Sequence, residues 1–356
     1  YGMTIPSIIK KNIPLAPYTT LGVGGRAEYF CECTSDTELH EVIVWAKQNV
    51  LPITILGDGS NVLIADEGVR GLVVKMNGKG IVYETAPDGH IHVRVASGEY
   101  WDDFVKEVTE KDLWGLENLS GIPGCVGAAP VQNINAYGVS VGDYIINVTA
   151  YHIETEKIIL LSRDACHFGY RDSFVKGQEG MKYVITEVTF VLRTEREDKV
   201  QYRSSSQSIE RNLLAKGITE PRAIDIRESV LAIRKNIGML KGMYQSAGSF
   251  FKNTILPPEN FERLEAIIAK EYPVESSRFA PWHWELPDGS VKVSTAFLME
   301  CTPYNKTNFS GQLFNGAVGI SPVHTLSLIN GGTATAHDFE EFVHCISTYV
   351  FEKFHV

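Results

Sequence analysis

Hydrophobic positions recur with a helical period in four parts of the chain. Residues 35–47 open with Ser35 and carry Glu38 three positions later, the capping-box pattern that starts a helix. Apolar residues follow at positions 39, 42, 43 and 46, so they share one face of that helix. The same spacing predicts helices in residues 101–108, 261–270 and 339–351.

Strand signals lie between these segments, without the regular strand–helix repeat of a doubly wound fold. Short β-branched or alternating apolar runs at 53–56, 72–76, 91–95, 147–161 and 183–192 predict strands. This mixture favours an α+β fold.

Two glycine-containing loops stand between the predicted elements. Residues 57–61 (GDGSN) follow a strand directly, and small residues there let backbone N–H groups approach an anion, although a tight turn fits the same residues. Residues 118–142 contain seven glycines and prolines, too many for a regular element. Together the loops favour a dinucleotide. By contrast, Gly22-x-Gly24-x-x-Ala27 lacks the preceding strand and following helix of a Rossmann site.

Composition narrows the classes of function. The chain of 356 residues is long enough for two or three domains, and a net charge of -10 without a basic run argues against a nucleic-acid partner. No stretch approaches the ~18 apolar residues of a membrane span, and no secretory signal is evident, so we expect a cytoplasmic protein without membrane insertion. Six dispersed cysteines predict reduced thiols and no metal site; even the close pair Cys31-x-Cys33 fits buried core thiols better than a metal or redox site.

Six longer stretches carry a family resemblance. They are TTLGVGGRAEYF, ILGDGSNVLIAD, GLENLSGIPGCVGAAPVQNINAYG, CHFGYRDSFVKG, SAGSFFKN and GISPVHTLSLINGGTATAHD, and they extend from residue 19 to residue 338. In sequence and order they resemble the UDP-N-acetylenolpyruvoylglucosamine reductase family, also called the UDP-N-acetylmuramate dehydrogenases.

The resemblance implies a fold and a reaction. The α+β fold would comprise an FAD-binding module of the vanillyl-alcohol-oxidase type in two subdomains (1–75 and 76–238), a third, substrate-binding α+β domain (239–350), and the start of a segment returning to subdomain 2 (351–356). NADPH would reduce non-covalently bound FAD, and flavin N5 would pass hydride to UDP-N-acetylglucosamine enolpyruvate, giving UDP-N-acetylmuramate for peptidoglycan synthesis. Oligomeric state stays open, and a monomer is compatible with the sequence.

The resemblance also names two catalytic residues. Ser249 in AGSFFKN would protonate the substrate carbon, because a hydroxyl can act as an acid towards a strongly basic carbanion. Arg171 in GYRDS would hold the substrate carboxylate and the enolate-like state with its planar guanidinium. Taken alone, Ser249 better fits a cap or turn, and Arg171 a surface ion pair with Asp172 or another acid; the surrounding motifs favour the catalytic roles.

Further binding residues follow from the same resemblance. Substrate contacts are expected from Tyr137, Tyr170, Tyr202, Asn253 and His324, and a core histidine is an equal interpretation of His324. Cofactor contacts are expected from Leu56, Gly57, Asp58, Gly59, Ser60, Asn61, Ile122, Pro123, Gly124, Ala128, Ala129, Gln132, Asn133, Gly138, Ile185 and Arg234.

The chain also departs from the family pattern. Ile237 stands where the family has a lysine, for which Lys235 or Lys241 could substitute, and residues 295–316 diverge from the family signature. A third catalytic group, a glutamate, is expected beyond Val356. Two alternative functions therefore stay open: another FAD-dependent oxidoreductase of the same superfamily, and a non-catalytic nucleotide-sugar binder.

Overall fold

The structure, a computed structural model, describes residues 4–196 and 206–356 and consists of two compact units. The first unit comprises the described residues up to Pro14, with Arg26–Gly59 and Gly68–Lys241. The second comprises Leu15–Gly25, Ser60–Glu67 and Gly242–Val356. Two loops of the region 1–75 therefore belong to the second unit.

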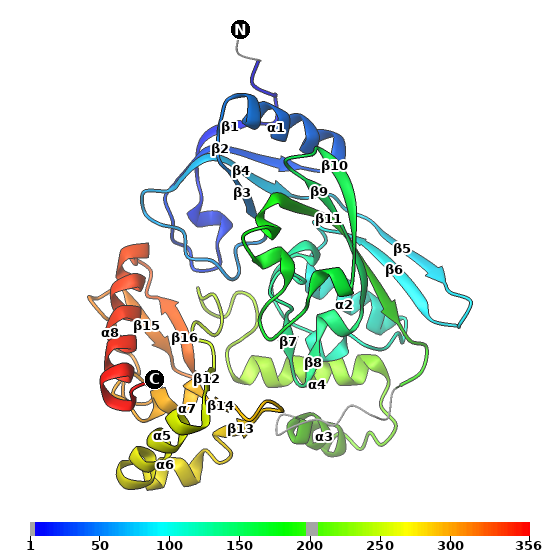
Figure 1. Cartoon of the computed structure of the whole chain (residues 1–356). Coiled ribbons are helices and arrows are strands. Elements are labelled where there is room, and N and C mark those ends of the chain that lie inside the picture. The colour runs from blue at the N-terminus through cyan, green and yellow to red at the C-terminus, as the bar shows by residue number, and fades with distance from the viewer. Residues whose placement is uncertain (1–3, 197–205) are drawn as a thin grey trace. The chain divides into compact units, whose positions relative to one another are not determined.

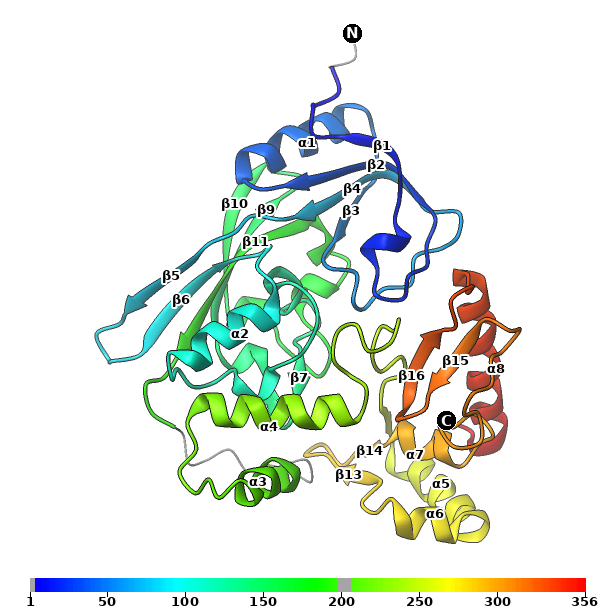
Figure 2. The same ribbon diagram turned by 180° about the vertical axis from the view of Figure 1, so that it is seen from behind.

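The first unit begins with a four-stranded mixed sheet in the order β1-β2-β4-β3 (Figure 1). β1 runs antiparallel to β2, whereas β2 and β3 run parallel to β4. Helix α1 covers one face of this sheet through buried Leu39, Val42 and Ile43 (Figure 2). The elements are β1 (Lys10–Pro14), β2 (Arg26–Cys33), α1 (Asp36–Gln48), β3 (Ile53–Leu56) and β4 (Val69–Met76).

The start of α1 confirms the predicted helix and corrects its cap. Ser35 Oγ accepts a hydrogen bond from Glu38 N at 3.2 Å, as the capping box requires. The Glu38 carboxylate does not return to Ser35; its Oε2 instead accepts from Thr34 N at 2.7 Å and Thr34 Oγ1 at 2.8 Å. The hydroxyl of Thr34 offers that carboxylate a second donor, which Ser35 N alone could not provide.

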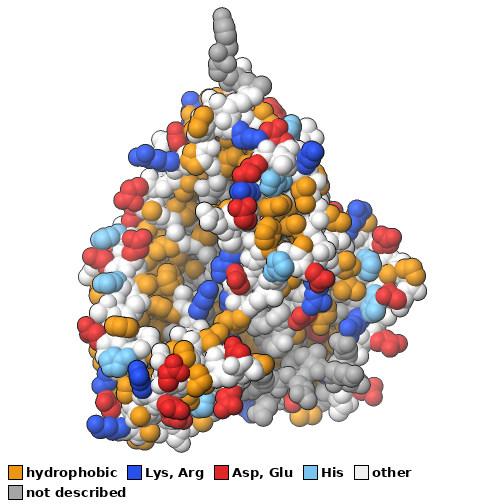
Figure 3. All heavy atoms as spheres, in the orientation of Figure 1, with side chains coloured by type: hydrophobic (Ala, Val, Ile, Leu, Met, Phe, Trp, Pro, Cys, Tyr) orange, Lys and Arg blue, Asp and Glu red, His pale blue; other side chains and the backbone are white. Residues whose placement is uncertain are grey.

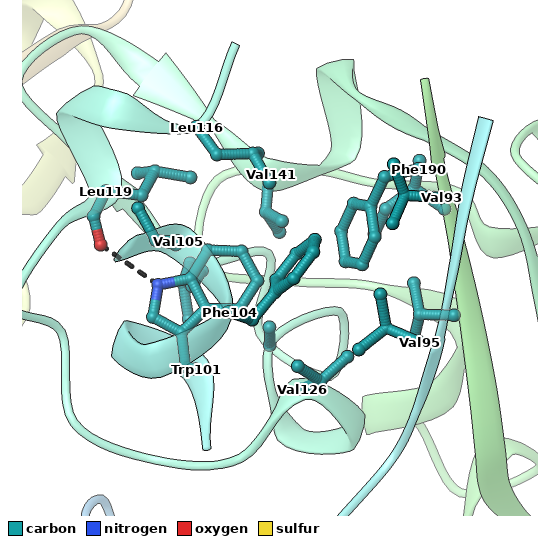
Figure 4. Packing of buried hydrophobic residues seen from close by; sticks show 14 of the residues in the cluster. Val93, Val95, Trp101, Phe104, Val105, Leu116, Leu119, Val126, Val141 and Phe190 are labelled. Carbon is teal, nitrogen blue, oxygen red and sulfur yellow. Dashed lines mark hydrogen bonds between the residues drawn. The ribbon is translucent and has the colours of Figure 1, made fainter. Parts of the chain in front are cut away.

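A second sheet of the first unit is wholly antiparallel, in the order β10-β9-β11-β6-β5. Helix α2 packs on it through Trp101 and Phe104, whose ring centroids lie 6.0 Å and 5.1 Å from that of Phe190 (Figure 4). The buried Trp101 Nε1 donates to Leu119 O at 2.9 Å. The elements are β5 (Ile81–Thr85), β6 (Ile91–Ala96), α2 (Trp101–Glu110), β9 (Ile145–His152), β10 (Lys157–Ser162) and β11 (Tyr183–Leu192).

The glycine- and proline-rich stretch 118–142 forms only short elements, as predicted. They are three short 3-10 helices (η) and one hairpin: η2 (Glu117–Leu119), η3 (Val126–Ala128), the hairpin β7 (Asn135–Ala136) with β8 (Val139–Ser140), and η4 (Val141–Asp143). Later in the unit come η5 (Asp164–Cys166), η6 (Phe174–Lys176), η7 (Gly180–Lys182), α3 (Ser206–Ala215) and α4 (Ala223–Asn236).

The second unit combines a small sheet, a hairpin, four α-helices and one short 3-10 helix. The sheet has the order β12-β14-β13, and α8 packs Phe339, Phe342 and Ile346 into the cluster beside β15 and β16. Residues 351–354 continue α8, and Phe354 packs against Tyr272 with ring centroids 5.7 Å apart. The elements are η1 (Ala16–Tyr18), β12 (Thr254–Leu256), α5 (Pro258–Glu271), α6 (Pro273–Arg278), β13 (His283–Glu285), β14 (Val291–Val293), α7 (Thr295–Glu300), β15 (Val318–Ser321), β16 (His324–Asn330) and α8 (Ala336–Phe354).

Both units mix helices with mainly antiparallel sheets, which confirms the predicted α+β class. No helix among the described residues is long and apolar enough to cross a membrane. On the face shown in Figure 3, basic side chains are interspersed with acidic ones. All six cysteines are free thiols; Cys31 Sγ and Cys33 Sγ lie 3.9 Å apart inside the first sheet's core.

Candidate active site

The start of the first glycine loop lies against the second glycine loop within the first unit, although the two are far apart in the sequence. Gly57 follows β3 directly, and a Cβ built on it would lie 3.2 Å from both Ala128 Cβ and Cys125 Sγ. The second loop is held in turn by Tyr100, which forms an antiparallel bridge with Cys125. This close approach favours glycine at position 57, because a side chain there would force the neighbouring atoms to move by a few tenths of an ångström.

A half-buried ion pair accompanies the first loop. Lys75 Nζ lies 2.5 Å from Asp58 Oδ1 and donates to Gly57 O at 3.3 Å. Burial raises the pKa of the neighbouring Cys125 thiol, and the Asp58 charge adds to this effect. Lys75 was missed by the sequence reasoning because it stands inside a strand pattern, with no local signal of its own.

Two buried polar atoms flank the glycine-rich segment. A Cβ on Gly127 would lie 2.6 Å from Ser97 Cβ, and one on Gly121 would lie 3.1 Å from Arg234 Cδ. Within the described part of the chain, Ser97 Oγ and Arg234 Nε have no hydrogen-bond partner. Because buried polar groups are normally paired, these two atoms beside close-packed glycines fit a polar ligand such as FAD.

Arg234 and Tyr137, both predicted site residues, come together in the structure. Arg234 is 7% exposed, and its Nη2 donates to Met239 O at 2.9 Å. Burial lowers the pKa of Arg234, with Tyr137 opposing the shift, and burial raises the pKa of Tyr137. Of the two lysines considered as substitutes at Ile237, Lys241 places Nζ 4.2 Å from the ring centroid of Tyr100.

Arg171 occupies a tight turn beside a cavity. Its φ is 53°, a left-handed conformation that is uncommon for a residue with a side chain. No carboxylate among the described side chains forms an ion pair with it; the nearby Arg163 and the buried Arg227, by contrast, are paired with Asp143 and Asp102. The cavity, of about 640 Å³, is lined by Asn133, Ser140, Asp143, Arg163, Asp164, His167, Phe168, Gly169 and Tyr170.

In the second unit, Ser249 lies in extended chain next to β16. It pairs with Ser327 in an antiparallel bridge, and Phe250 N donates to Leu326 O at 2.8 Å. Ser249 is exposed and caps none of the described helices. Ser327 Oγ in turn lies 3.4 Å from Nδ1 of the partly buried His324.

The remaining predicted residues are distributed over both units. In the second unit, the side-chain oxygen of Asn253 accepts from Thr295 N at 3.1 Å. Tyr202 lies outside the described residues, which contain no cluster of His, Cys, Asp or Glu suited to a metal ion. Leu56, Gly59, Ile122, Pro123, Gly124, Ala129, Gln132, Gly138 and Ile185 belong to the first unit, whereas Ser60 and Asn61 belong to the second.

Comparison with known proteins shows which family has this sequence and architecture. Residues 27–160 match the FAD binding domain, and residues 240–356 match the C-terminal domain of UDP-N-acetylenolpyruvoylglucosamine reductase. A protein of that name from Thermobifida fusca is 37% identical over 333 residues, which cover 92% of this chain and 90% of the relative. The chain belongs to the UDP-N-acetylenolpyruvoylglucosamine reductase family.

Other members extend the same similarity. The UDP-N-acetylenolpyruvoylglucosamine reductase of Neisseria meningitidis serogroup C is 32% identical over 348 residues, covering 98% of this chain and 95% of the relative. The crystal structure of the reductase from Thermus caldophilus superposes with a TM-score of 0.63 at 24% identity, covering 96% and 95% of the two chains, and supports the fold. The chain is therefore an FAD-dependent oxidoreductase, as its resemblance predicted.

Proposed function

We propose that the protein reduces UDP-N-acetylglucosamine enolpyruvate to UDP-N-acetylmuramate, with NADPH as the hydride donor. The observation that carries this proposal is family membership along nearly the whole chain, since both the FAD-binding match and the C-terminal match are present. Bound FAD would accept hydride from NADPH and deliver it to the enolpyruvyl group. Such a reaction belongs to peptidoglycan precursor synthesis.

The cofactor would be held by the glycine loops. Gly57 and the segment from Ile122 to Ala129 offer backbone at close approach, and Ser97 Oγ and Arg234 Nε offer buried polar atoms for its ring or chain. Backbone and small side chains bind a diphosphate or flavin without steric conflict. The buried guanidinium of Arg234 would also favour negative charge on a neighbouring ligand.

Two residues would act on the substrate. Arg171, a cation without a carboxylate partner among the described side chains, would bind the substrate carboxylate and stabilise charge developing on it. Ser249 would donate its hydroxyl proton to the carbon next to the one that receives hydride. The pairing of the Ser249 segment with β16 supports this role because it fixes the backbone that carries the hydroxyl.

The test is anaerobic stopped-flow spectroscopy of the full-length protein in two separate half-reactions. For Ser249→Ala, we expect flavin reduction by NADPH to stay near wild type and reoxidation by the enolpyruvyl substrate to fall roughly 10²-fold, the size of a general-acid contribution. Ser290→Ala, in an exposed turn of the same unit, is the matched control. Reoxidation at the wild-type rate in Ser249→Ala would refute the proton-donor role. Absence of reoxidation in the wild-type protein would refute the proposal that the enolpyruvyl sugar nucleotide is its substrate.

A further inference from the structure

The turn that carries Arg171 is closed but strained. Gly169 N donates to Asp172 O at 2.9 Å, which places Tyr170 and Arg171 at its tip. A left-handed conformation costs a residue with a side chain about 1–2 kcal/mol, so neighbouring contacts must hold Arg171 at its φ of 53°. One such contact is local: Lys176 Nζ donates to Arg171 O at 2.7 Å.

Two side-chain hydrogen bonds tie both ends of this turn to a single segment. At the first end, Asn133 Nδ2 donates to Gly169 O at 2.9 Å. At the other end, Ser173 Oγ donates to Val131 O at 2.6 Å. Asn133 is 7% exposed and Ser173 5% exposed, so little water competes for either bond.

The orientation of the Asn133 amide is fixed from its other side. Its Oδ1 accepts from Gly142 N at 2.9 Å, which leaves Nδ2 directed at Gly169. A Cβ on Gly142 would lie 2.9 Å from Asn133 Oδ1 and 2.6 Å from Phe168 Cγ, so only glycine permits this arrangement. Both polar atoms of the Asn133 side chain are therefore engaged within the protein, and a cofactor contact from this residue would use its backbone.

The segment that holds the turn also continues from the cofactor loop. Val131 N donates to Ala128 O at 3.3 Å, and Ile134 N donates to Ala129 O at 3.1 Å, so residues 128–134 form one run of turns. Ala128 is also the residue whose Cβ closes on Gly57. A shift of this segment would thus move the Arg171 turn together with the glycine loops.

We infer that Asn133 and Ser173 are positioning residues that set the Arg171 guanidinium relative to the bound cofactor. The inference rests on the role proposed above for Arg171. Neither residue needs to touch the substrate, because a misplacement of about 1 Å at a reacting group can cost 10²-fold in rate. The sequence placed Asn133 among the cofactor contacts and gave Ser173 no role, since nothing local shows that the two residues hold one turn.

The test combines Ser173→Ala and Asn133→Asp, singly and together with Arg171→Ala. Aspartate tolerates the left-handed φ of 45° at position 133 and keeps the acceptor for Gly142, but it removes the donor to Gly169. We expect each single variant to slow reoxidation by the enolpyruvyl substrate about 10-fold or more. Flavin reduction by NADPH, and FAD affinity measured on the apoprotein by fluorescence, should change less than about 2-fold, because cofactor loops away from the turn are intact.

The double variants separate positioning from a general structural effect. If Ser173 and Asn133 act through Arg171, neither substitution should slow reoxidation further in Arg171→Ala. Additive losses, or equal losses in FAD affinity and both half-reactions, would overturn the inference. If Arg171→Ala itself reoxidises at the wild-type rate, the proposed role of Arg171 fails. If Arg171→Ala is slow while Ser173→Ala and Asn133→Asp are normal, only the positioning role of Asn133 and Ser173 fails.

Matched substitutions control for the loss of a hydrogen bond as such. Ser229→Ala removes a fully buried hydroxyl that donates to Asp225 O at 3.0 Å, and Asn49→Asp removes an amide that donates to Trp45 O at 2.8 Å. Both should leave reoxidation unchanged. Should the buried variants fail to fold, Lys176→Met removes the bond to Arg171 O from an exposed side chain. When introduced into the wild-type protein, Lys176→Met should still slow reoxidation. When introduced into Arg171→Ala, it should have no further effect, and any other pattern counts against the inference.

Discussion

Arg227 forms a bidentate ion pair with Asp102, with N–O distances of 2.5 Å and 2.9 Å, and so joins α4 to the first turn of α2. Asp102 Oδ1 also accepts from Gly121 N at 2.5 Å. The same carboxylate therefore anchors the start of the glycine-rich segment. Arg227 is 7% exposed at its side chain and Asp102 20%, so the pair is largely removed from water.

Asp102→Asn should destabilise the fold and change its acid sensitivity. It leaves the Arg227 charge buried without a counter-charge, which typically costs about 3–5 kcal/mol. Burial alone would raise the pKa of Asp102, but the bonds from Arg227 and Gly121 outweigh it and lower the pKa. The wild type should therefore keep this stabilisation above about pH 3.9, the unfolded pKa, and lose it as pH falls through the lower folded pKa.

Chemical denaturation at several pH values measures both effects. The variant should lack the part of the acid destabilisation that arises from Asp102. Asp143→Asn is the control, because its pair with Arg163 is more than half exposed and should contribute at most about 1 kcal/mol. Equal losses for both variants would show that the buried pair contributes no more than a surface pair.

Gly57→Ala should weaken FAD binding more than it weakens the fold. The added methyl would meet Ala128 and Cys125 at 3.2 Å, so the two loops must separate by a few tenths of an ångström. We expect a loss of about 10-fold in affinity, or about 1.4 kcal/mol, in titrations of the apoprotein followed by flavin fluorescence. Gly177→Ala, where the nearest atom lies at 3.4 Å and φ is -72°, should bind FAD normally. If Gly57→Ala binds FAD with unaltered affinity, the close approach of Gly57 to Ala128 and Cys125 does not contribute to cofactor binding.

Phe104→Ala should cost about 3–5 kcal/mol in the free energy of unfolding. Its ring is 1% exposed and packs between Trp101 and Phe190, so truncation leaves a cavity that rigid neighbours fill poorly (Figure 4). Ile158→Ala, on the edge strand β10 and 46% exposed, should change stability by about 0.5 kcal/mol or less. Urea denaturation distinguishes the two, and a loss below about 1 kcal/mol for Phe104→Ala would show that this core can collapse around the gap.

The cysteines should differ sharply in reactivity in the native protein. Its hydrogen bond with Cys33 and its burial raise the pKa of Cys31, while burial raises the pKa of Cys166 to about 11 and of Cys301 to about 12. Thiolate, the reactive form, is therefore scarce on these residues at pH 8. Alkylation at pH 8 followed by mass spectrometry should label the partly exposed Cys345 first. Early labelling of Cys31 would indicate local opening of the first sheet.

The sequence predicted the elements whose pattern is local. The apolar positions of α1, α2, α5 and α8 and the strand runs β3, β6 and β11 were recognisable because each buries one face of a regular element. Helix α4 was missed, since its charged residues, including Arg227 and Arg234, are buried and so blur the contrast between its faces. The prediction for the cap of α1 was correct for the bond from Glu38 N to Ser35 Oγ and wrong for the return bond, because the Glu38 carboxylate accepts from the adjacent Thr34 instead.

By itself, the sequence determined the family and the FAD-binding character and supplied the candidate site residues, because those depend on which residues are present and in what order. Only the tertiary structure decided which groups meet. It brought Gly57 against Ala128, put Ser97 and Arg234 beside the glycine segment, and tied the Arg171 turn to residues 131–133. These contacts join positions far apart along the chain, and a hydrogen bond or a van der Waals contact depends on distances that local patterning does not encode.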